Sequence, residues 1–393
     1  ATAETGSATA APAERISGPH VHENLAIYFV HGPSAPGAVP LTLAEALDNA
    51  AVEVRETGTV NTLEIENTSD HDVYIQSGDI VKGGKQDRVL TMSLLLPPKS
   101  GRVPIGSFCV EQGRWAARGK EDVKAFTSAR EAMPSREAKL AMNRPKVAPA
   151  PLPVAGRGPV QQGRVPSYTE QQTANAAQQR GDTLSGAAQQ RGDTLSGAAQ
   201  QRGDTLSGAA QQRGDYASGS SRQSDVWAEV AKTQAKLAAG LTTASVAAPE
   251  SKSSLQLTLE HQKLKEARAA YLAALSGAAK AEGDIVGYVF AVNGKLNSAD
   301  IYPSNGLFQK MWPKLLNASI TEAIGERSAS EAKAAAPVPT AVQTFLDAAE
   351  KGKSQENAFG KLMKQEIREA DAALYVEARK ASGGFVHRNY IAK

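Results

Sequence analysis

The sequence predicts an α+β protein with a strand-rich core of sandwich or jelly-roll type, packed amphipathic helices and a long low-complexity loop. Short β-rich runs separated by turn clusters fill residues 52–115. Helical patterns and a clear hairpin occupy residues 224–393. Because the strands and helices are mixed without strict alternation, we expect α+β rather than a doubly wound parallel sheet.

Composition and charge narrow the classes of protein to consider. The 393 residues carry a net charge of +3 from 44 basic and 41 acidic side chains. This balance does not indicate nucleic-acid binding, which usually requires a concentrated basic face. No run approaches the roughly 18 apolar residues of a membrane helix. The lone Cys109 excludes an intramolecular disulfide, so we expect stability to come from packing.

In the first half, we expect a strand at residues 19–31 and a short helix that begins at Leu41 or Thr42. Strands follow in the runs LEIE, DVYIQ, RVLTMSLLL and VPIGSFCVE, which NTSD, SGD, KGG and PPKSG separate as turn clusters. Residues 124–142 have a helical pattern, with Pro134 as a break or a first-turn residue.

In the second half, a helix is expected from Ser224 or Asp225 to Gly240, and a single long amphipathic helix at 255–275. Residues 285–302 form the clearest hairpin, turning at Asn293-Gly294 in the type I′ conformation. A helix at 304–326, kinked or started at Pro313, a helix near 341–350 and strands at 369–379 and 383–393 complete the pattern.

We expect residues 1–18 to be a flexible leader of a mature protein. Residues 19–144 and 224–393 are then two halves of one domain, separated by a low-complexity insertion at 145–223. The first residues are small, polar and proline-containing, as they are after removal of a signal peptide. The expected location is therefore secreted or at the cell surface.

Three stretches resemble a known family: GGKQDRVL at 83–90, FCVEQGRW at 108–115, and the text from 287 to 316. The family is the mostly exported, bacterial ARG-and-rhodanese-phosphatase-associated domain, largely of unknown function. The resemblance covers nearly all of the chain outside the leader and the 145–223 tract, and it implies no particular activity. It implies that a family site would consist of Gln86, Asp87, Arg88, Cys109, Glu111, Arg114 and Trp115.

Two interpretations of these residues remain open. On a strand, Cys109 and Glu111 would point to the same face. A thiolate stabilised by Arg88 or Arg114 could then act as a nucleophile, with Glu111 as acid or base, Asp87 nearby and a histidine such as His71 or His387 approaching in space. In the alternative, Cys109 is a small buried hydrophobe and the charged residues form a structural ion-pair network.

Metal and cofactor sites are not expected. His20, His22 and Glu23 offer ligand atoms, as do Asp70, His71 and Asp72, but a metal site requires three or four converging ligands. GDIVKGGK is glycine-rich, yet it lacks the strand–GxxxxGK[ST]–helix frame of a phosphate-binding loop. Trp227, Phe308 and Trp312 lie on helical stripes and are expected in the core.

The tract contains four Arg-Gly-Asp triplets in an eleven-residue repeat, RGDTLSGAAQQ. With one leucine and two glycines, the unit has too little apolar surface to fold alone or as a coiled coil. Three interpretations of the repeat remain open. It is a solvated loop that arose by duplication without selection for its sequence, a multivalent display of an adhesive motif, or an arm that adds a strand to a neighbouring subunit's sheet. The candidate binding residues are Arg180, Gly181, Asp182, Arg191, Gly192, Asp193, Arg202, Gly203, Asp204, Arg213, Gly214 and Asp215.

We therefore expect an exported, non-enzymatic structural or binding protein that self-assembles as a homo-oligomer or polymer, such as a filament or surface-layer-like subunit. The repeat would be its contact or display element. Two alternatives remain open: an enzyme with a Cys109 nucleophile supported by Glu111, Asp87 and Arg114, and an adhesin that binds a host-cell receptor through Arg-Gly-Asp.

Overall fold

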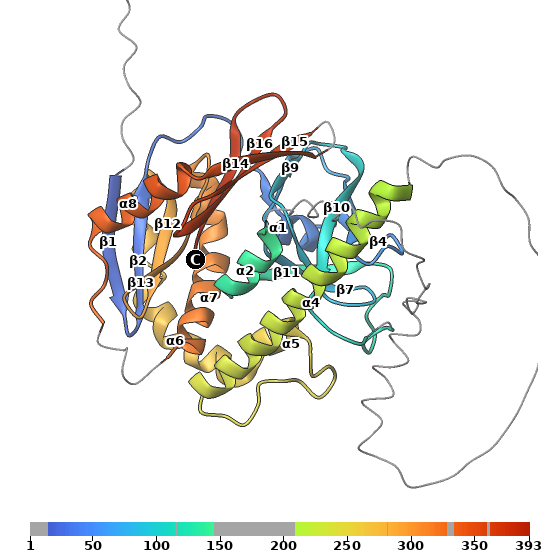
Figure 1. The fold of residues 1–393 in the computed structure, drawn as a ribbon, viewed down its shortest axis with the longest axis horizontal. Coiled ribbons are helices and arrows are strands. Elements are labelled where there is room, and N and C mark those ends of the chain that lie inside the picture. Colours follow the sequence, from blue (N-terminus) through green and yellow to red (C-terminus); the bar gives the residue numbers. More distant parts are fainter. Residues whose placement is uncertain (1–14, 115, 145–208, 281, 328–333, 360–361) are drawn as a thin grey trace, which may run out of the picture. The chain divides into compact units, whose positions relative to one another are not determined.

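Strands form three sheets in the part of the chain that the computed structural model describes (Figure 1). It describes residues 15–114, 116–144, 209–280, 282–327, 334–359 and 362–393, and only the backbone of 128, 209–221 and 359. The strand-rich α+β class is confirmed, whereas the sandwich or jelly-roll arrangement stays a prediction.

The largest sheet has eight antiparallel strands in the order β1-β2-β12-β13-β17-β16-β15-β14. Its hairpin β12–β13 turns at Asn293 and Gly294, whose φ angles of 51° and 74° confirm the predicted turn of two left-handed residues. The strands are β1 (Arg15–His22), β2 (Leu25–His31), β12 (Ile285–Val292), β13 (Lys295–Ile301), β14 (Lys353–Phe359), β15 (Met363–Glu369), β16 (Ala373–Lys380) and β17 (Phe385–Ala392).

Helices cover both faces of this sheet because its strands are apolar on both sides. Helix α8 (Pro339–Glu350) packs on the face that carries Tyr28 and Tyr390, and α7 (Asn305–Gly325) packs on the face that carries Phe29 and Tyr288. Helix α7 also contacts β11 of the second sheet, so it lies between the two large sheets (Figure 1). It begins after the N-cap Ser304 and includes Pro313 in its interior.

The second sheet has six strands in the order β11-β7-β8-β10-β5-β4 and is nearly closed into a barrel. Its two edges meet at an isolated bridge between Arg55 and Ala125, beside a hydrogen bond from Glu56 N to Lys124 O of 3.2 Å. The strands are β4 (Val52–Glu56), β5 (Thr62–Asn67), β7 (Asp79–Gly83), β8 (Arg88–Leu90), β10 (Gly101–Cys109) and β11 (Phe126–Ala132).

The remaining elements pack around these two sheets. Helix α1 (Leu43–Asp48) contacts β4 and β11, and a reciprocal pair of hydrogen bonds between Thr42 and Glu45 caps its start. The helix predicted to begin at Leu41 or Thr42 therefore begins at Leu43. The small third sheet has the order β3-β6-β9. The other elements are β3 (Leu41–Thr42), β6 (Val73–Ile75), β9 (Leu94–Leu96), α2 (Arg136–Asn143), α4 (Ala209–Gly240), α5 (Leu255–Leu259), α6 (Gln262–Leu275) and the 3₁₀ turn η1 (Ala278–Lys280).

Five predicted elements differ from the structure. The strand expected over RVLTMSLLL is divided into β8 and β9, which belong to different sheets. The strand expected at 19–31 is the hairpin β1–β2, which turns at Glu23 with a φ of 50°. The helix expected at 124–142 is strand β11 followed by α2, because the segment before Pro134 pairs with β7. The helix expected at 255–275 is divided into α5 and α6, since a new N-cap at His261 starts the second helix. Helix α4 starts at Ala209 rather than near Ser224, inside the tract expected as an insertion.

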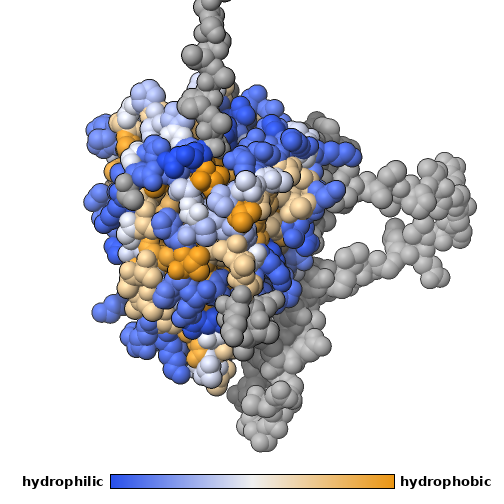
Figure 2. Space-filling view, turned by 90° about the vertical axis from the view of Figure 1, so that its left-hand side faces the viewer, coloured by the Kyte–Doolittle hydropathy of each residue, from blue (hydrophilic) through white to orange (hydrophobic). Residues whose placement is uncertain are grey.

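The described surface has few large exposed apolar side chains. Those exposed by more than a third are Val21, Val39 and Val338. Figure 2 shows small hydrophobic areas set among hydrophilic ones on the side where β1 and α8 lie. No helix among the described residues is long and apolar enough to cross a membrane.

Candidate functional site

The motif GGKQDR forms the tight connection between β7 and β8. Gly83 and Gly84 have φ angles of +123° and +57°, where side chains are disfavoured. A Cβ atom on Gly84 would lie 2.6 Å from Cζ of Phe126 and 2.9 Å from Oε1 of Glu56. The two glycines therefore let the loop lie directly against the point where β4 and β11 meet.

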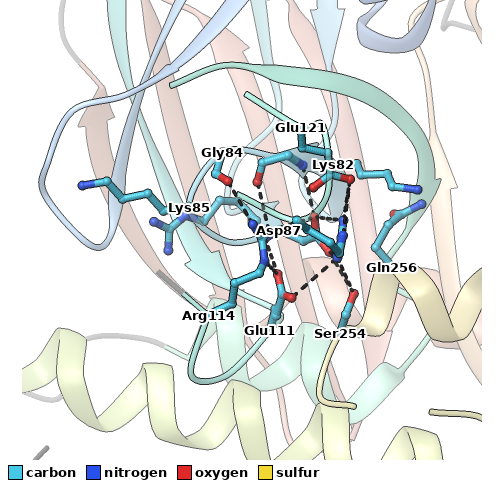
Figure 3. A network of polar contacts seen from close by, with 12 residues as sticks. Lys82, Gly84, Lys85, Asp87, Glu111, Arg114, Glu121, Ser254 and Gln256 are labelled. Atoms are coloured by element: carbon cyan, nitrogen blue, oxygen red, sulfur yellow. Dashed lines mark hydrogen bonds and ion pairs between the residues drawn. The ribbon is translucent and has the colours of Figure 1, made fainter. Parts of the chain in front are cut away.

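Asp87 is the centre of a buried charge network (Figure 3). Its two carboxylate oxygens accept hydrogen bonds from Nη1 and Nη2 of Arg118 at 2.9 and 3.0 Å. Ser254 Oγ donates at 2.8 Å and the Gly83 N–H at 3.1 Å. Burial opposes the charge of Arg118, but the hydrogen bonds and charge of Asp87 raise the pKa of that guanidinium above its ordinary value.

Glu111 joins this network from the segment after β10. Its Oε2 accepts from Arg114 Nε at 2.8 Å and from the Asp87 N–H at 3.1 Å, and its Oε1 lies 3.5 Å from Arg118 Nη1. Arg114 also donates to the carbonyl oxygen of Gly84 at 3.1 Å. These contacts hold the motif loop by both its side chains and its backbone. We define Asp87, Glu111, Arg114, Arg118 and Ser254 as the motif network.

Cys109 belongs to a separate contact. It lies opposite Arg88 in the β10–β8 pairing, and the Arg88 guanidinium contacts both Sγ and the carboxylate of Glu56. Gln223 of α4 bonds to the N–H and the carbonyl oxygen of Cys109, each at 2.9 Å. Burial raises the pKa of the thiol to about 11, although the charge of Arg88 acts to lower it. This environment is the opposite of one that activates a nucleophile.

The structure therefore brings some of the predicted site residues together and separates others. Asp87, Glu111 and Arg114 converge, whereas Cys109 pairs with Arg88; Gln86 is buried beside them. Trp115 lies outside the described residues. The sequence interpretation missed Arg118, Ser254 and Glu56. Arg118 lies only three residues beyond the motif, but nothing local marks the other two.

An open groove of about 1010 Å³ lies along the seam between β4 and the segment that leads into β11. Lys85 and Glu56 line it and join it to the motif loop, since the Lys85 N–H donates to Glu56 Oε1 at 3.1 Å. Its lining includes both signs of charge. The acidic residues are Glu53, Glu56, Glu64 and Asp122, and the basic residues are Arg55, Lys85, Arg102 and Lys124.

A second buried polar group, which we call the junction cluster, lies between the eight-stranded sheet and the segments that connect β6 to β7 and β8 to β9. His387 Nδ1 is 2.9 Å from Ser93 Oγ, and its Nε2 is 3.1 Å from Asp300 Oδ1. Asn389 Nδ2 donates to the same oxygen at 2.8 Å, and Gln76 Nε2 is 3.5 Å away. The sequence offered His387 as a possible partner of Cys109, but in the structure its ring contacts Ser93 and Asp300 instead. Ser93 and His387 are only 3% and 2% exposed, which leaves no access for a substrate.

The histidines of the β1–β2 hairpin contact aromatic or charged neighbours. His20 packs on Phe29 and His22 on Tyr271, with ring centroids 5.3 and 4.8 Å apart. The group of possible metal ligands among the described residues is His31, Glu282 and Asp284, and the Arg15 guanidinium contacts all three.

Most of the Arg-Gly-Asp repeat cannot be compared with the prediction. The first three triplets, Arg180–Asp182, Arg191–Asp193 and Arg202–Asp204, lie outside the described residues. The backbone of the fourth, residues 213–215, lies in helix α4.

The comparisons with known proteins give a family and no activity. No curated protein and no solved structure matches the chain. The family model of the ARG and Rhodanese-Phosphatase-superfamily-associated Protein domain matches residues 14–165 and 188–391. These ranges include the motif network, the groove and the junction cluster, and the break between them falls inside the 145–223 tract. The chain belongs to the ARG and Rhodanese-Phosphatase-superfamily-associated Protein domain family.

Proposed function

We propose that the protein is an exported, non-enzymatic structural or binding protein that assembles with copies of itself, with the Arg-Gly-Asp repeat as a contact or display element. One observation carries the non-enzymatic part. The groups with catalytic potential, Asp87, Glu111 and Cys109, are fully buried and bonded to neighbouring side chains or backbone groups.

The motif network fits a structural role. Asp87 and Glu111 are fully buried, and each accepts hydrogen bonds from an arginine and from the backbone. A general acid or base must reach a proton on its substrate, and these carboxylates present no exposed oxygen. The enzyme alternative also requires an accessible thiolate at Cys109, which is 0% exposed with a raised pKa.

A polar mode of assembly agrees with the described surface. Stable interfaces that rely on the hydrophobic effect usually need a contiguous apolar patch. With three scattered valines as its large exposed apolar side chains, the described surface favours contacts made by charges and by backbone hydrogen bonds.

Electron microscopy of the native exported protein tests this proposal. Three samples are compared: the full chain, a variant that lacks Gln178–Asp215, and a variant with a Gly/Ser linker of equal length in its place. We expect filaments or sheets from the full chain and isolated particles from both variants. Isolated particles from all three would refute self-assembly. Assemblies that persist without the repeat would show that another surface makes the contact.

A further inference from the structure

We propose that His31, Glu282 and Asp284 bind a divalent transition-metal ion, with Zn²⁺ as the ion that suits these ligands, and that the ion displaces the guanidinium of Arg15. The site goes beyond the proposed self-assembly and does not depend on it. It lies at one end of the eight-stranded sheet, where β1 begins, β2 ends and β12 begins side by side (Figure 1).

The sheet brings the ligands together from separate parts of the chain. His31 pairs with Arg15 of β1 on one side and with the first residue of β12 on the other. Glu282 and Asp284 stand just before β12, and the Gly32 N–H donates to the carbonyl oxygen of Asp284 at 3.0 Å. The imidazole is 2% exposed, whereas the two carboxylate side chains are 46% and 53% exposed. An ion can therefore reach the site from solvent without opening the fold.

The Nδ1 atom of His31 has two partners that it cannot satisfy together. It lies 2.8 Å from Asp284 Oδ1 and 3.0 Å from Arg15 Nη2. A guanidinium can only donate and an ionised carboxylate can only accept, so one of the two contacts is unfavourable whether or not Nδ1 carries a proton. A metal ion removes this conflict, because it binds the lone pair of Nδ1 and the carboxylate oxygen at the same time.

The other nitrogen of the ring supports this role of Nδ1. His31 Nε2 lies 2.7 Å from Ser17 Oγ, so a proton on Nε2 has an acceptor and the lone pair stays on Nδ1. Histidines that bind metals usually donate their second N–H to an oxygen in this way, which fixes the tautomer and the orientation of the ring.

The distances fit tetrahedral coordination. Bonds of about 2.0–2.2 Å to zinc place neighbouring ligand atoms about 3.3–3.6 Å apart. His31 Nδ1 is 3.4 Å from Glu282 Oε2, and the three ligand atoms lie within 4.8 Å of one another. The half-exposed carboxylate of Asp284, now 2.8 Å from Nδ1, has to move outward by roughly 0.5 Å. A zinc ion with three protein ligands keeps its fourth position for water or for a donor atom of a second molecule.

The position of Arg15 shows that this point attracts positive charge. Its Nη2 is 2.6 Å from Glu282 Oε2 and 3.7 Å from Asp284 Oδ2. One guanidinium faces two carboxylates, and a divalent ion would balance both. The Arg15 side chain is 55% exposed, so it can leave for solvent at little cost. An imidazole among the ligands favours zinc and its neighbours over Ca²⁺ and Mg²⁺, which prefer oxygen ligands.

Isothermal titration calorimetry with ZnCl₂ on the full-length protein, freed of metal with EDTA and dialysed, tests the site. The site variant combines Glu282→Gln and Asp284→Asn. We expect it to bind Zn²⁺ at least about a hundredfold more weakly, since even the loss of a group that only supports a ligand typically costs about 10–100-fold. The matched control, Glu64→Gln with Glu66→Gln, also removes two carboxylates two residues apart beside an arginine, Arg102, and should bind as the wild type does.

Two further measurements separate the roles of Arg15 and His31. Arg15→Gln removes the competing cation, so we expect about two- to fivefold tighter binding, the equivalent of the surface ion pair that the ion breaks. In the ¹⁵N-labelled wild type, Zn²⁺ should shift the NMR signal of His31 Nδ1 much more than that of Nε2, a measurement that requires no variant. An excess of Ca²⁺ or Mg²⁺ should not displace Zn²⁺.

Equal zinc affinity of the wild type and a site variant that circular dichroism shows to be folded would overturn the inference. Ring signals of His31 that remain unchanged at saturating Zn²⁺ would overturn it as well, whatever the fold of the variant. Unchanged affinity in Arg15→Gln would refute the displacement of the guanidinium by the ion.

Discussion

The motif network and the junction cluster bury similar polar groups by different means. The motif network surrounds two carboxylates with two arginines and the backbone N–H groups of Gly83 and Asp87. The junction cluster surrounds Asp300 with an imidazole and two side-chain amides.

This difference separates permanent charge from titratable charge. A guanidinium keeps its proton at any physiological pH, whereas a buried carboxyl group without such a partner can change state. Burial acts to raise the pKa of Asp300, yet its hydrogen bond to His387 and other partners hold the pKa below its ordinary value. The nearby Glu322 lacks an ion-pair partner within salt-bridge distance among the described residues, and burial raises its pKa to about 7. We therefore expect the motif network to contribute most to the free energy of unfolding. Asp300 and Glu322, which both lie near Lys139 of α2, should determine how that free energy depends on pH.

The largest effect should come from removing one arginine of the motif network. Arg118→Met keeps much of the side-chain volume but leaves Asp87 buried without its bidentate partner. We expect the free energy of unfolding to fall by about 3–5 kcal/mol, because a buried carboxylate that keeps only Arg114, 3.7 Å away, as an ion-pair partner is costly. Urea unfolding monitored by circular dichroism measures it.

Arg102→Met is the control. Arg102 is 58% exposed and lies 3.6 Å from Glu64 and Glu66, so its loss should cost less than about 1 kcal/mol. Equal effects of the two substitutions would remove the distinction between the buried network and a surface ion pair.

The same contrast explains what the sequence could predict. Much of the motif network comes from two short stretches, GGKQDR and the segment after Cys109, so a local pattern indicated Asp87, Glu111 and Arg114 as neighbours. Ser254 is far away in the sequence. The junction cluster joins Gln76, Ser93, Asp300 and His387 through strand pairing, so no stretch of the sequence contains its pattern.

The fold follows a similar rule. The Asn-Gly turn of the β12–β13 hairpin is a local signal, and that prediction was correct. The Thr42–Glu45 cap of α1 is equally local, but only a helix start at Leu41 or Thr42 was predicted there. Strand β11 was predicted as helix because its partner, β7, decides its conformation. Tertiary pairing overrides local propensity at such a segment.

A smaller, pH-dependent effect is expected at Glu322. Its folded-state pKa of about 7 is above the ordinary value, so the buried carboxyl contributes stability at low pH that is lost as the pH rises through 7. Between pH 5 and 8 the wild type should lose about 1–3 kcal/mol of unfolding free energy through this group. Glu322→Gln should lack this loss, since its amide oxygen can still accept from the N–H of Arg136 and from Asn297.

Unfolding free energies at pH 5, 6, 7 and 8 measure this difference. Glu356→Gln on β14, an exposed carboxylate, should follow the wild type at every pH. Parallel pH profiles for the wild type and Glu322→Gln would show that the carboxyl is ionised in the folded protein throughout the range, and the contrast with the motif network would then fail.

The smallest effect is expected at Cys109, beside the motif network but outside it. Cys109→Ser keeps an acceptor for Arg88 in a buried site, so we expect a loss of about 1 kcal/mol. In the wild type, iodoacetamide should label this thiol at the rate of protein opening, with labelling that accelerates as urea is added. Fast labelling at pH 6 without urea would mean that the thiol is accessible and its pKa depressed. Cys109 would then return as a candidate nucleophile, and the motif network would have to be regarded as part of an active site rather than as a structural support.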